Sequence, residues 1–259
     1  YRDSKLQNNN LLNNLIYINY MEDKRFNGKA GEEYNLFKLA CPHFEKLENT
    51  LGKIIKEQFQ DKNNPEVKIL EIGCGPGFTT LILLDSDERT KIIAVDNESV
   101  MIEQAKDILK EFIDKNRVQL VEDDALEFLK KQDSDSFDVF ASGFTLHNFP
   151  NDFREKVLKE IYRALKPEGI FVNADKYALD DESEHKKSLN WQLQQFKEKY
   201  SQINRPDLIE EWTSHYLEDD KPNVIMKESD SIKAMNKIGF KGINVVFRKQ
   251  MEAVLFAKK

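Results

Sequence analysis

Apolar residues along this chain follow two different periods. Short, mainly apolar runs are typical of strands that are buried on both faces of a sheet, and they occur at 67–72, 91–96, 117–121, 136–142 and 169–174. The segments after these runs carry apolar residues at three- and four-residue steps, which predicts helices over 77–84, 98–113, 124–131 and 151–165. This alternation predicts an α/β fold with a mainly parallel sheet that helices cover on both faces.

The chain before the first strand has two parts. Residues 26–60 have a helical pattern, which Pro42 divides into two helices. Residues 1–25 are rich in asparagine and contain one short apolar patch at 15–18. This patch is too short to cross a bilayer and has no basic lead, so we expect a mobile N-terminal arm rather than a membrane or signal segment.

The alternation is interrupted between 180 and 227. Two amphipathic helices are expected there, around 191–200 and 206–217, in a charged setting. No Gly/Ser linker surrounds them, so we interpret the region as a helical insertion and expect 26–259 to form a single domain. The chain then closes with a helix and two strands, at 229–238, 242–247 and 251–256.

Composition and charge restrict the class of protein. The net charge is −7 and no basic run is present, which favours a small-molecule substrate over a dedicated nucleic-acid surface, although a basic patch formed in space leaves RNA binding open. Cys41 and Cys74 have no metal-ligand or disulfide spacing. We therefore expect no metal, no membrane association and a cytoplasmic location, while the oligomeric state is not indicated.

The first strand runs directly into a glycine-rich turn. An acid precedes three alternate glycines, with a cysteine between the first two: Glu71, Gly73, Cys74, Gly75 and Gly77. Glycines at such a turn let a ligand approach the main chain closely. The dinucleotide fingerprint G-x-G-x-x-G requires a third glycine at position 78, which is phenylalanine, so a nucleoside-type ligand without a pyrophosphate fits better than NAD.

Acids also follow the second and third strands. Asp96 ends the second strand, where an acid accepts hydrogen bonds from ribose hydroxyls, and Asn97 can add an amide contact. Asp124 and the backbone N–H of Ala125 follow the third strand and are expected to contact an adenine edge. Each acid alone is also a good helix N-cap, and it is their repetition at successive strand ends that favours a ligand site.

Together, the glycine turn and the two acids make residues 26–259 resemble the class I S-adenosylmethionine-dependent methyltransferases. The resemblance implies a Rossmann-like, doubly wound sheet of seven mostly parallel strands. It also implies N-terminal helices and a helical insertion before the last two strands. S-adenosyl-L-methionine is the implied cofactor, and methyl transfer to a small-molecule acceptor is the implied reaction.

Within that superfamily the chain resembles the carboxy-S-adenosylmethionine synthases, which serve tRNA wobble-uridine modification. The similar runs are 92–104, 144–146, 163–169 with the Lys176 region, and 229–240. The synthases' tyrosine and asparagine cofactor contacts fall on Phe44 and Gly143, and the arginine expected to hold their extra carboxylate is missing from 211–216. We therefore predict an ordinary S-adenosylmethionine enzyme. A synthase-like or tRNA-modifying enzyme and a non-catalytic cofactor-binding module are the alternatives.

Candidates for the acceptor side follow the fourth and fifth strands. His147 is the best-placed titratable group near the methyl. It could act as a general base, or it could hold its loop. The sequence favours the loop-holding role, because methyl transfer to sulfur or to a neutral amine needs no base. Aromatic and histidine residues could wall an acceptor or simply fasten the insertion to the sheet: Tyr177, Trp191, Trp212, His215 and Tyr216.

Overall fold

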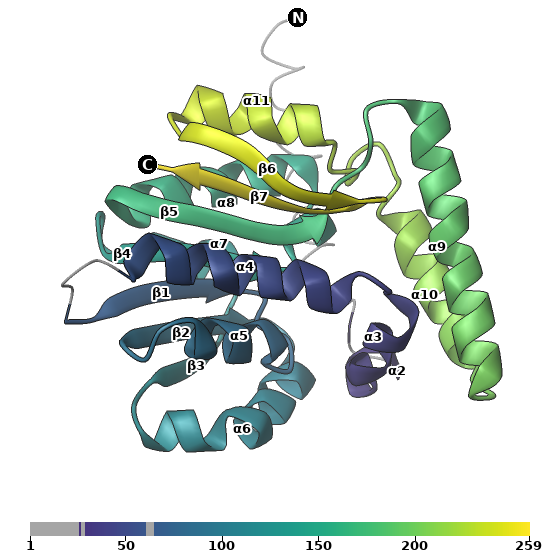
Figure 1. Cartoon of the computed structure of the whole chain (residues 1–259), viewed down its shortest axis with the longest axis horizontal. Helices are drawn as coiled ribbons and strands as arrows, with labels where there is room; N and C mark the ends of the chain where they lie inside the picture. Colours follow the sequence, from purple (N-terminus) through teal and green to yellow (C-terminus); the bar gives the residue numbers. More distant parts are fainter. Residues whose placement is uncertain (1–25, 27–28, 61–64) are drawn as a thin grey trace, which may run out of the picture.

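The computed structural model describes residue 26 and residues 29–60 and 65–259, so the expected arm over 1–25 lies outside the described residues. Seven strands form one sheet in the order β3-β2-β1-β4-β5-β7-β6 (Figure 1). Their bounds are β1 Val67–Ile72, β2 Thr90–Asp96, β3 Val118–Glu122, β4 Phe137–Gly143, β5 Leu165–Lys176, β6 Lys241–Lys249 and β7 Glu252–Lys258. The predicted α/β fold is confirmed.

Strand pairing is parallel from β3 to β5 and antiparallel at β7. β1 pairs in parallel with both β2 and β4, and β5 pairs with β7 in the opposite direction. β5 is longer than the strand predicted at 169–174. Its residues before Gly169 and its polar last residues also join the ladder, with β4 and with β7.

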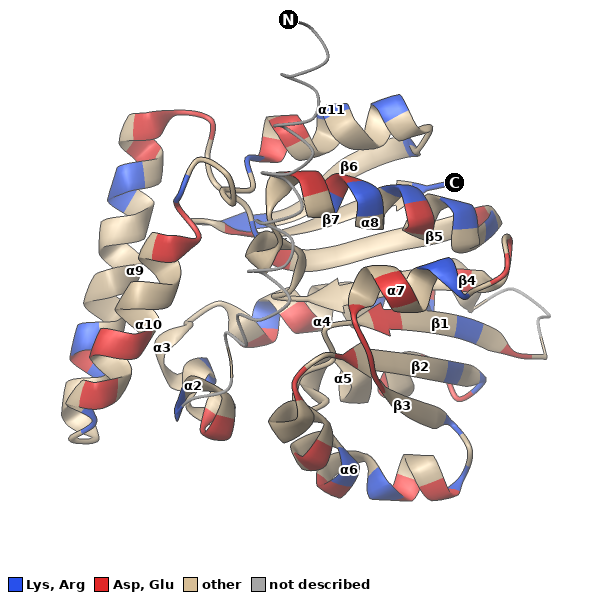
Figure 2. Ribbon diagram, turned by 180° about the vertical axis from the view of Figure 1, so that it is seen from behind, with Lys and Arg blue, Asp and Glu red and all other residues tan. Residues whose placement is uncertain are grey.

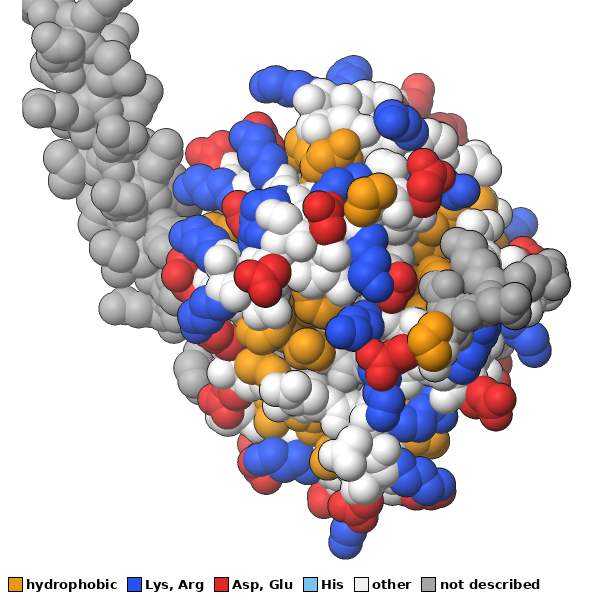
Figure 3. All heavy atoms as spheres, turned by 90° about the vertical axis from the view of Figure 1, so that its left-hand side faces the viewer, with side chains coloured by type: hydrophobic (Ala, Val, Ile, Leu, Met, Phe, Trp, Pro, Cys, Tyr) orange, Lys and Arg blue, Asp and Glu red, His pale blue; other side chains and the backbone are white. Residues whose placement is uncertain are grey.

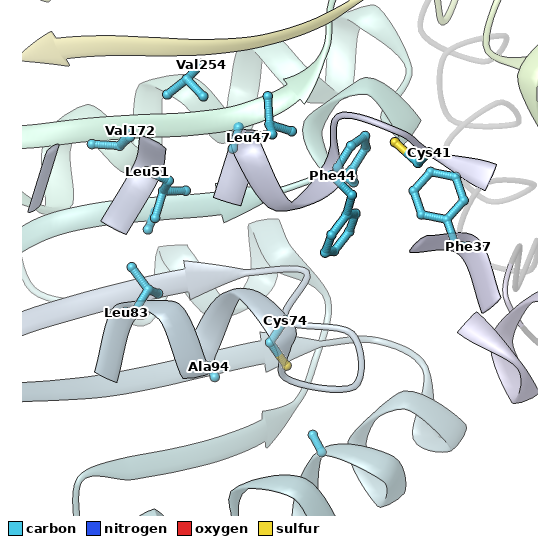
Figure 4. Packing of buried hydrophobic residues seen from close by; sticks show 14 of the residues in the cluster. Phe37, Cys41, Phe44, Leu47, Leu51, Cys74, Leu83, Ala94, Val172 and Val254 are labelled. Atoms are coloured by element: carbon cyan, nitrogen blue, oxygen red, sulfur yellow. The ribbon is translucent and has the colours of Figure 1, made fainter. Parts of the chain in front are cut away.

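Helices cover both faces of the sheet, as predicted. One face carries α4 (Phe44–Phe59), α5 (Phe78–Ser86) and α6 (Ser99–Asp114); the other carries α7 (Ala125–Lys130), α8 (Asn151–Ala164) and α11 (Glu228–Ile238). Figure 4 shows how α4 is fixed: Leu47 and Leu51 lie close to Val172 and Val254 of the sheet, with Leu83 of α5 beside them. Burying each such side chain contributes about 1.5–3 kcal/mol.

The leader before α4 is more broken than the sequence predicted. It forms α2 (Lys29–Glu32), the 3-10 turn η1 (Tyr34–Leu36) and α3 (Phe37–Ala40), and Pro42 separates them from α4. Cys41 and Phe37 lie beside Phe44 at the start of α4 (Figure 4).

The insertion forms two long helices, α9 (Glu182–Gln202) and α10 (Pro206–Glu218), at the end of the molecule where α2 and α3 lie (Figure 1). α9 begins well before the predicted 191, because Asp181 caps it by accepting from the backbone N–H of Glu184 at 2.9 Å. None of the described helices is both long and apolar enough to cross a bilayer.

Candidate functional site

Acidic residues gather at the carboxyl edge of the sheet. Figure 2 shows acidic segments where β1, β2 and β3 end and basic bands near their starts; the strand sequences place Lys68 and Lys91 early and Glu71 and Asp96 late. Ligands of open α/β sheets bind outside the carboxyl ends of the strands. This edge is therefore the candidate site.

Each of the three glycines of the turn is needed for a different structural reason. All have positive φ: +70° at Gly73, +52° at Gly75 and +94° at Gly77. A Cβ on Gly73 would lie 2.1 Å from the Thr145 hydroxyl, and one on Gly77 would lie 2.8 Å from Leu109 of α6. A Cβ on Gly75 would have no atom within 4 Å, so only Gly75 faces open space where a ligand has room.

Cys74, between the first two glycines, is buried, and its backbone N–H donates to Val95 O at 3.1 Å. Burial raises the pKa of its thiol well above the ordinary value. Its contribution at this position is therefore its backbone and its small apolar volume rather than thiolate chemistry.

Asp96 joins β2 to the glycine turn. Its Oδ2 accepts from the backbone N–H of Gly75 at 2.8 Å, and its Oδ1 accepts from the backbone N–H of Glu98 at 2.9 Å. Burial raises the pKa of this carboxyl. A carboxylate has about four acceptor positions, so these two bonds leave capacity for the hydroxyls of a ribose.

Asp124 caps α7, the role that the sequence left open beside adenine binding. Its Oδ1 accepts from the backbone N–H groups of Leu126 and Glu127 at 2.9 and 3.0 Å. A small cavity of about 30 Å³ collects the residues expected to contact ribose and adenine, together with the first glycine of the turn. They are Gly73, Asp96, Asn97, Asp124 and Ala125, joined by Thr145 and Phe149.

Two neighbouring threonines of α5 each hold a buried acid. Thr80 Oγ1 donates to Glu71 Oε2 at 2.7 Å, and Thr79 Oγ1 donates to Glu48 Oε1 at 3.0 Å. Among the described residues, the second oxygen of each carboxyl has no hydrogen-bond partner. Burial raises the pKa of Glu71 to about 8 and that of Glu48 to about 7. Two buried acids that are each only half satisfied fit a cationic ligand, and S-adenosylmethionine is one.

Glu48 was not predicted as a site residue. The available signal was its position in the helical pattern, because it shares the buried stripe of α4 with Phe44, Leu47 and Leu51 and is itself only 3% exposed. A charged residue in an apolar stripe is rarely buried without a partner.

A second, aromatic cavity of about 20 Å³ lies on the other side of the loop that follows β4. The insertion, the leader and that loop contribute its lining residues: Phe26, Tyr34, Phe37, Phe144, His147, Asn148, Trp212, His215, Tyr216 and Asp219. Trp212 is at its centre, with ring centroids 4.5 Å from Phe37 and 6.0 Å from Tyr34. Its indole N–H has no partner within the described part of the chain.

His147 is held between two acids in this cavity. Its Nδ1 lies 2.5 Å from Asp175 Oδ1, and its Nε2 lies 3.5 Å from Asp219 Oδ2. Asp175 also accepts from the backbone N–H groups of His147 and Lys176, so it ties the loop to the end of β5. Lys176 Nζ donates to Asp219 Oδ2 at 2.5 Å and lies 4.0 Å from the ring centroid of Tyr216.

The remaining predicted residues lie in different places. Phe44 stacks on Phe144, a residue of the aromatic cavity, with ring centroids 5.6 Å apart, and Gly143 ends β4 beside Glu48. Tyr177 is buried in the core of the opposite face of the sheet, where it accepts from Asn173. Trp191 stacks on His43 at 5.7 Å. Eight of the predicted residues line neither cavity: Glu71, Cys74, Gly75, Gly77, Phe44, Gly143, Tyr177 and Trp191.

A larger cavity of about 640 Å³ lies at the opposite, amino edge of the sheet, the side that Figure 3 presents. Its wall includes Lys68, Lys91 and Arg117. It lies at the edge away from the strand ends that bind ligands in this type of sheet, and it contains none of the predicted residues, so size alone does not identify the site.

Comparison with known proteins identifies the class of this protein. A family model described as a methyltransferase domain matches residues 69–169. The chain is 30% identical to the carboxy-S-adenosyl-L-methionine synthase of Photobacterium profundum, over 67% of this chain and 69% of that protein. It is 29% identical to the synthase of Shewanella sediminis, over 88% of this chain and 89% of that protein. The match to the Vibrio cholerae synthase spans 66% of that relative.

A solved O-methyltransferase family protein from Burkholderia thailandensis has the same fold, with a TM-score of 0.63 at 10% identity, over 92% of this chain and 62% of that one. The chain therefore belongs to the class I S-adenosylmethionine-dependent methyltransferases. Within that class it is similar to the carboxy-S-adenosyl-L-methionine synthases. The predicted class, fold and S-adenosylmethionine cofactor are confirmed.

Proposed function

We propose that this enzyme transfers a methyl group from S-adenosylmethionine to a small molecule held in the aromatic cavity. The observation that carries the proposal is the loop after β4. Thr145 and Phe149 line the nucleoside cavity, whereas Phe144, His147 and Asn148 line the aromatic one. One loop therefore separates a cofactor-type cavity from an acceptor-type cavity, which is the arrangement that direct transfer between two bound molecules requires.

The protein's own task is to orient the acceptor and exclude water. When bound, S-adenosylmethionine supplies a methyl group that is already activated on a sulfonium sulfur. Gly75, Asp96 and Asp124 would hold it at the carboxyl edge. The aromatic walls would position an apolar acceptor group and keep water from the transfer path.

His147 is proposed as the base for an acceptor that must lose a proton. Its Nδ1 lies 2.5 Å from Asp175 Oδ1, which fixes the ring, and its Nε2 faces Asp219 Oδ2 at 3.5 Å, so a bound acceptor would have to replace that contact. A base oriented by a third group is the arrangement typical of general-base sites. The sequence favoured a loop-holding role, and the contact with Asp175 is compatible with that role as well, so the two must be separated by kinetics.

A carboxy-S-adenosylmethionine synthase activity is the second candidate, and the 30% identity to such a synthase favours it. The acidic surroundings oppose it. α9 and α10 contain no arginine, and the Glu211 side chain of α10 accepts from the backbone N–H of Ala30 at 2.8 Å. Lys176 already pairs with Asp219, so it is not a free partner for an additional carboxylate.

We also propose a location, a type of partner and a domain organisation for this protein. Cys41 and Cys74 are both free and buried, which supports a reducing, cytoplasmic location. The net charge of −7 supports a small-molecule partner over nucleic acid. The single sheet supports the proposal that 26–259 form one domain with an insertion.

Two measurements test the proposal. Mass spectrometry of the ligand that co-purifies distinguishes S-adenosylmethionine from its carboxylated form, which differs by one carboxyl group. A screen for cofactor-dependent methyl release across metabolite and RNA extracts then identifies the acceptor. Labelled small molecules would support the proposal; a carboxylated cofactor, or labelled RNA alone, would replace it with the alternatives.

A further inference from the structure

We infer that the Glu48 carboxylate receives the ammonium group of the cofactor's amino-acid tail. The inference rests on the proposed function, because it requires the carboxyl edge to bind S-adenosylmethionine. It assigns a cofactor contact to α4, outside the glycine turn and the strand-end acids that identify the site in the sequence.

The order of the strands places Glu48 on the tail side of the cofactor. The residues expected to hold adenine and ribose follow β3 and β2, and the glycine turn follows β1. The next strand across the sheet is β4, which ends at Gly143. A Cβ on Gly143 would lie 2.8 Å from Glu48 Oε1 and 2.3 Å from Thr79 Oγ1, so this carboxylate occupies the space that a side chain would take at the end of β4.

The local contacts leave Glu48 incomplete. Thr79 satisfies Oε1, while Oε2 has no partner among the described residues although Glu48 is 3% exposed. An unpartnered oxygen in a buried carboxylate is costly, and the cost is recovered when a cation binds. The cofactor's tail carries an ammonium group, which has the donors and the charge that Oε2 lacks.

The groups around Glu48 supply little positive charge, so the surroundings do not neutralise it. Lys38 is the one cation that acts on it appreciably within the described residues; its Nζ lies 3.1 Å from the Phe78 ring centroid. The other groups that interact electrostatically with Glu48 are Tyr34, Cys41, Glu71 and Asp175. Burial raises the pKa values of Tyr34 and Cys41, so both side chains stay neutral, and Glu48 itself is the main acceptor for a bound ammonium group.

The test compares two ligands that differ in the tail. S-adenosylhomocysteine has the nucleoside, the sulfur and the amino-acid tail; 5′-methylthioadenosine has the nucleoside and the sulfur but no amino acid. Calorimetry on the full chain should show that Glu48→Gln, which keeps an oxygen for Thr79, weakens S-adenosylhomocysteine binding about 10–100-fold. Its affinity for 5′-methylthioadenosine should change less than about threefold, within the range of a surface substitution. Glu45→Gln, an exposed acid on the same helix, is the matched control and should change neither.

The pH dependence gives a second readout that needs no variant. The pKa of Glu48 is raised to about 7 by burial, so the ligand-free protein binds a proton there that pairing with an ammonium group would release. The affinity for S-adenosylhomocysteine should therefore rise about tenfold from pH 6 to pH 8, and that for 5′-methylthioadenosine should stay nearly constant.

The outcomes separate the inference from the proposed function. If the wild-type chain binds both ligands and Glu48→Gln weakens them equally, or weakens neither, Glu48 does not read the tail and the inference is overturned while the cofactor site stands. If the wild-type chain binds neither ligand, the proposed function is overturned together with the inference. A selective loss for S-adenosylhomocysteine that Glu45→Gln does not show supports the inference.

Discussion

The proposed nucleoside half and the proposed acceptor half of this site are built in different ways. The nucleoside half is formed by strand ends and the turns that follow them, with Gly75 and Asp96 joined by a hydrogen bond of 2.8 Å. The acceptor half is assembled from segments far apart in the chain: Phe26 and Tyr34 from the leader, the loop after β4, and α10 of the insertion.

This difference indicates in which half the lining residues can change without disturbing the fold. Each nucleoside contact is set by a short local sequence that must also make a strand and a turn. Each acceptor contact depends on how helices from distant segments pack, so a changed helix face changes the cavity without disturbing the sheet. The cofactor is therefore fixed by the class of protein, whereas the acceptor is a property of this chain.

The largest expected effect lies on the acceptor side. His147→Asn should lower turnover about 10²–10³-fold and leave S-adenosylhomocysteine affinity nearly unchanged, because a base acts on the acceptor and not on the cofactor. The acidic limb of the pH–rate profile should also disappear. Turnover is measured with the acceptor that the methyl-release screen identifies.

His185→Asn is the matched control for that variant. His185 is also a buried histidine paired with an acid, Asp220 at 2.7 Å, but it lies outside both cavities. Its replacement should affect stability only. If His147→Asn keeps near-normal turnover and loses only stability, as His185→Asn is expected to do, the loop-holding role is correct and no base is needed.

On the nucleoside side, Asp96→Ala should weaken S-adenosylhomocysteine binding about 100-fold. Each lost hydrogen bond to a charged acceptor contributes roughly 1.5–3 kcal/mol, and the effects of two such bonds are not additive. The glycine turn also loses its contact at Gly75 N–H. Calorimetry measures the affinity, and the melting temperature checks that the chain stays folded. Glu122→Ala, at the exposed register partner on β3, should bind normally; equal weakening in both variants would contradict the ribose assignment.

At the glycine turn, two matched variants can separate the effect of backbone strain from the effect of a lost ligand contact. Gly75 and Gly242 have nearly the same conformation, with φ of +52° and +59°, and a Cβ added to either would have no atom within 4 Å. Replacing either by alanine should cost about 1 kcal/mol of stability through backbone strain. Only Gly75→Ala should also weaken S-adenosylhomocysteine binding, by about tenfold or more. Similar binding by the two variants would mean that the open space at Gly75 is not used by the ligand.

Half of the residues that line the nucleoside cavity could be predicted from the sequence, because their signals are local. Gly73, Asp96 and Asp124 stand at ends of apolar runs, and runs of that kind define strands without reference to the rest of the chain. Glu48 was missed although its position in the buried stripe of α4 is visible, because only the fold shows that this stripe reaches the end of β4.

Prediction on the acceptor side was mixed for the same reason. Trp191 and Trp212 look alike in the sequence, yet Trp212 is buried in the cavity and Trp191 stacks on His43. Which face of a helix meets the sheet depends on packing between distant segments, and a sequence of aromatic residues does not specify it. Tyr177 follows the end of β5 as expected, but its side chain enters the core on the opposite face of the sheet.

The smallest expected effect concerns α2, which connects the two halves. On the acceptor side, Ala30 N–H donates to Glu211 Oε1 of α10 at 2.8 Å; on the cofactor side, Gln104 of α6 donates to Gly31 O at 2.9 Å. Because α2 spans both halves, we expect it to move when a ligand enters or leaves, and a single hydrogen bond contributes about 0.5–1.5 kcal/mol to holding it.

Glu211→Ala removes the acceptor of the Ala30 bond and should raise the S-adenosylhomocysteine dissociation rate about 2–10-fold, with a stability change below about 1 kcal/mol. Stopped-flow measurement of ligand release tests this, and Glu210→Ala, an exposed neighbour on the same helix, is the control. Faster release in the Glu211 variant alone would mean that the insertion controls access to the cofactor half although it contributes no residue to that cavity. Equal rates in both variants would mean that the two halves, joined by α2 in the fold, operate independently.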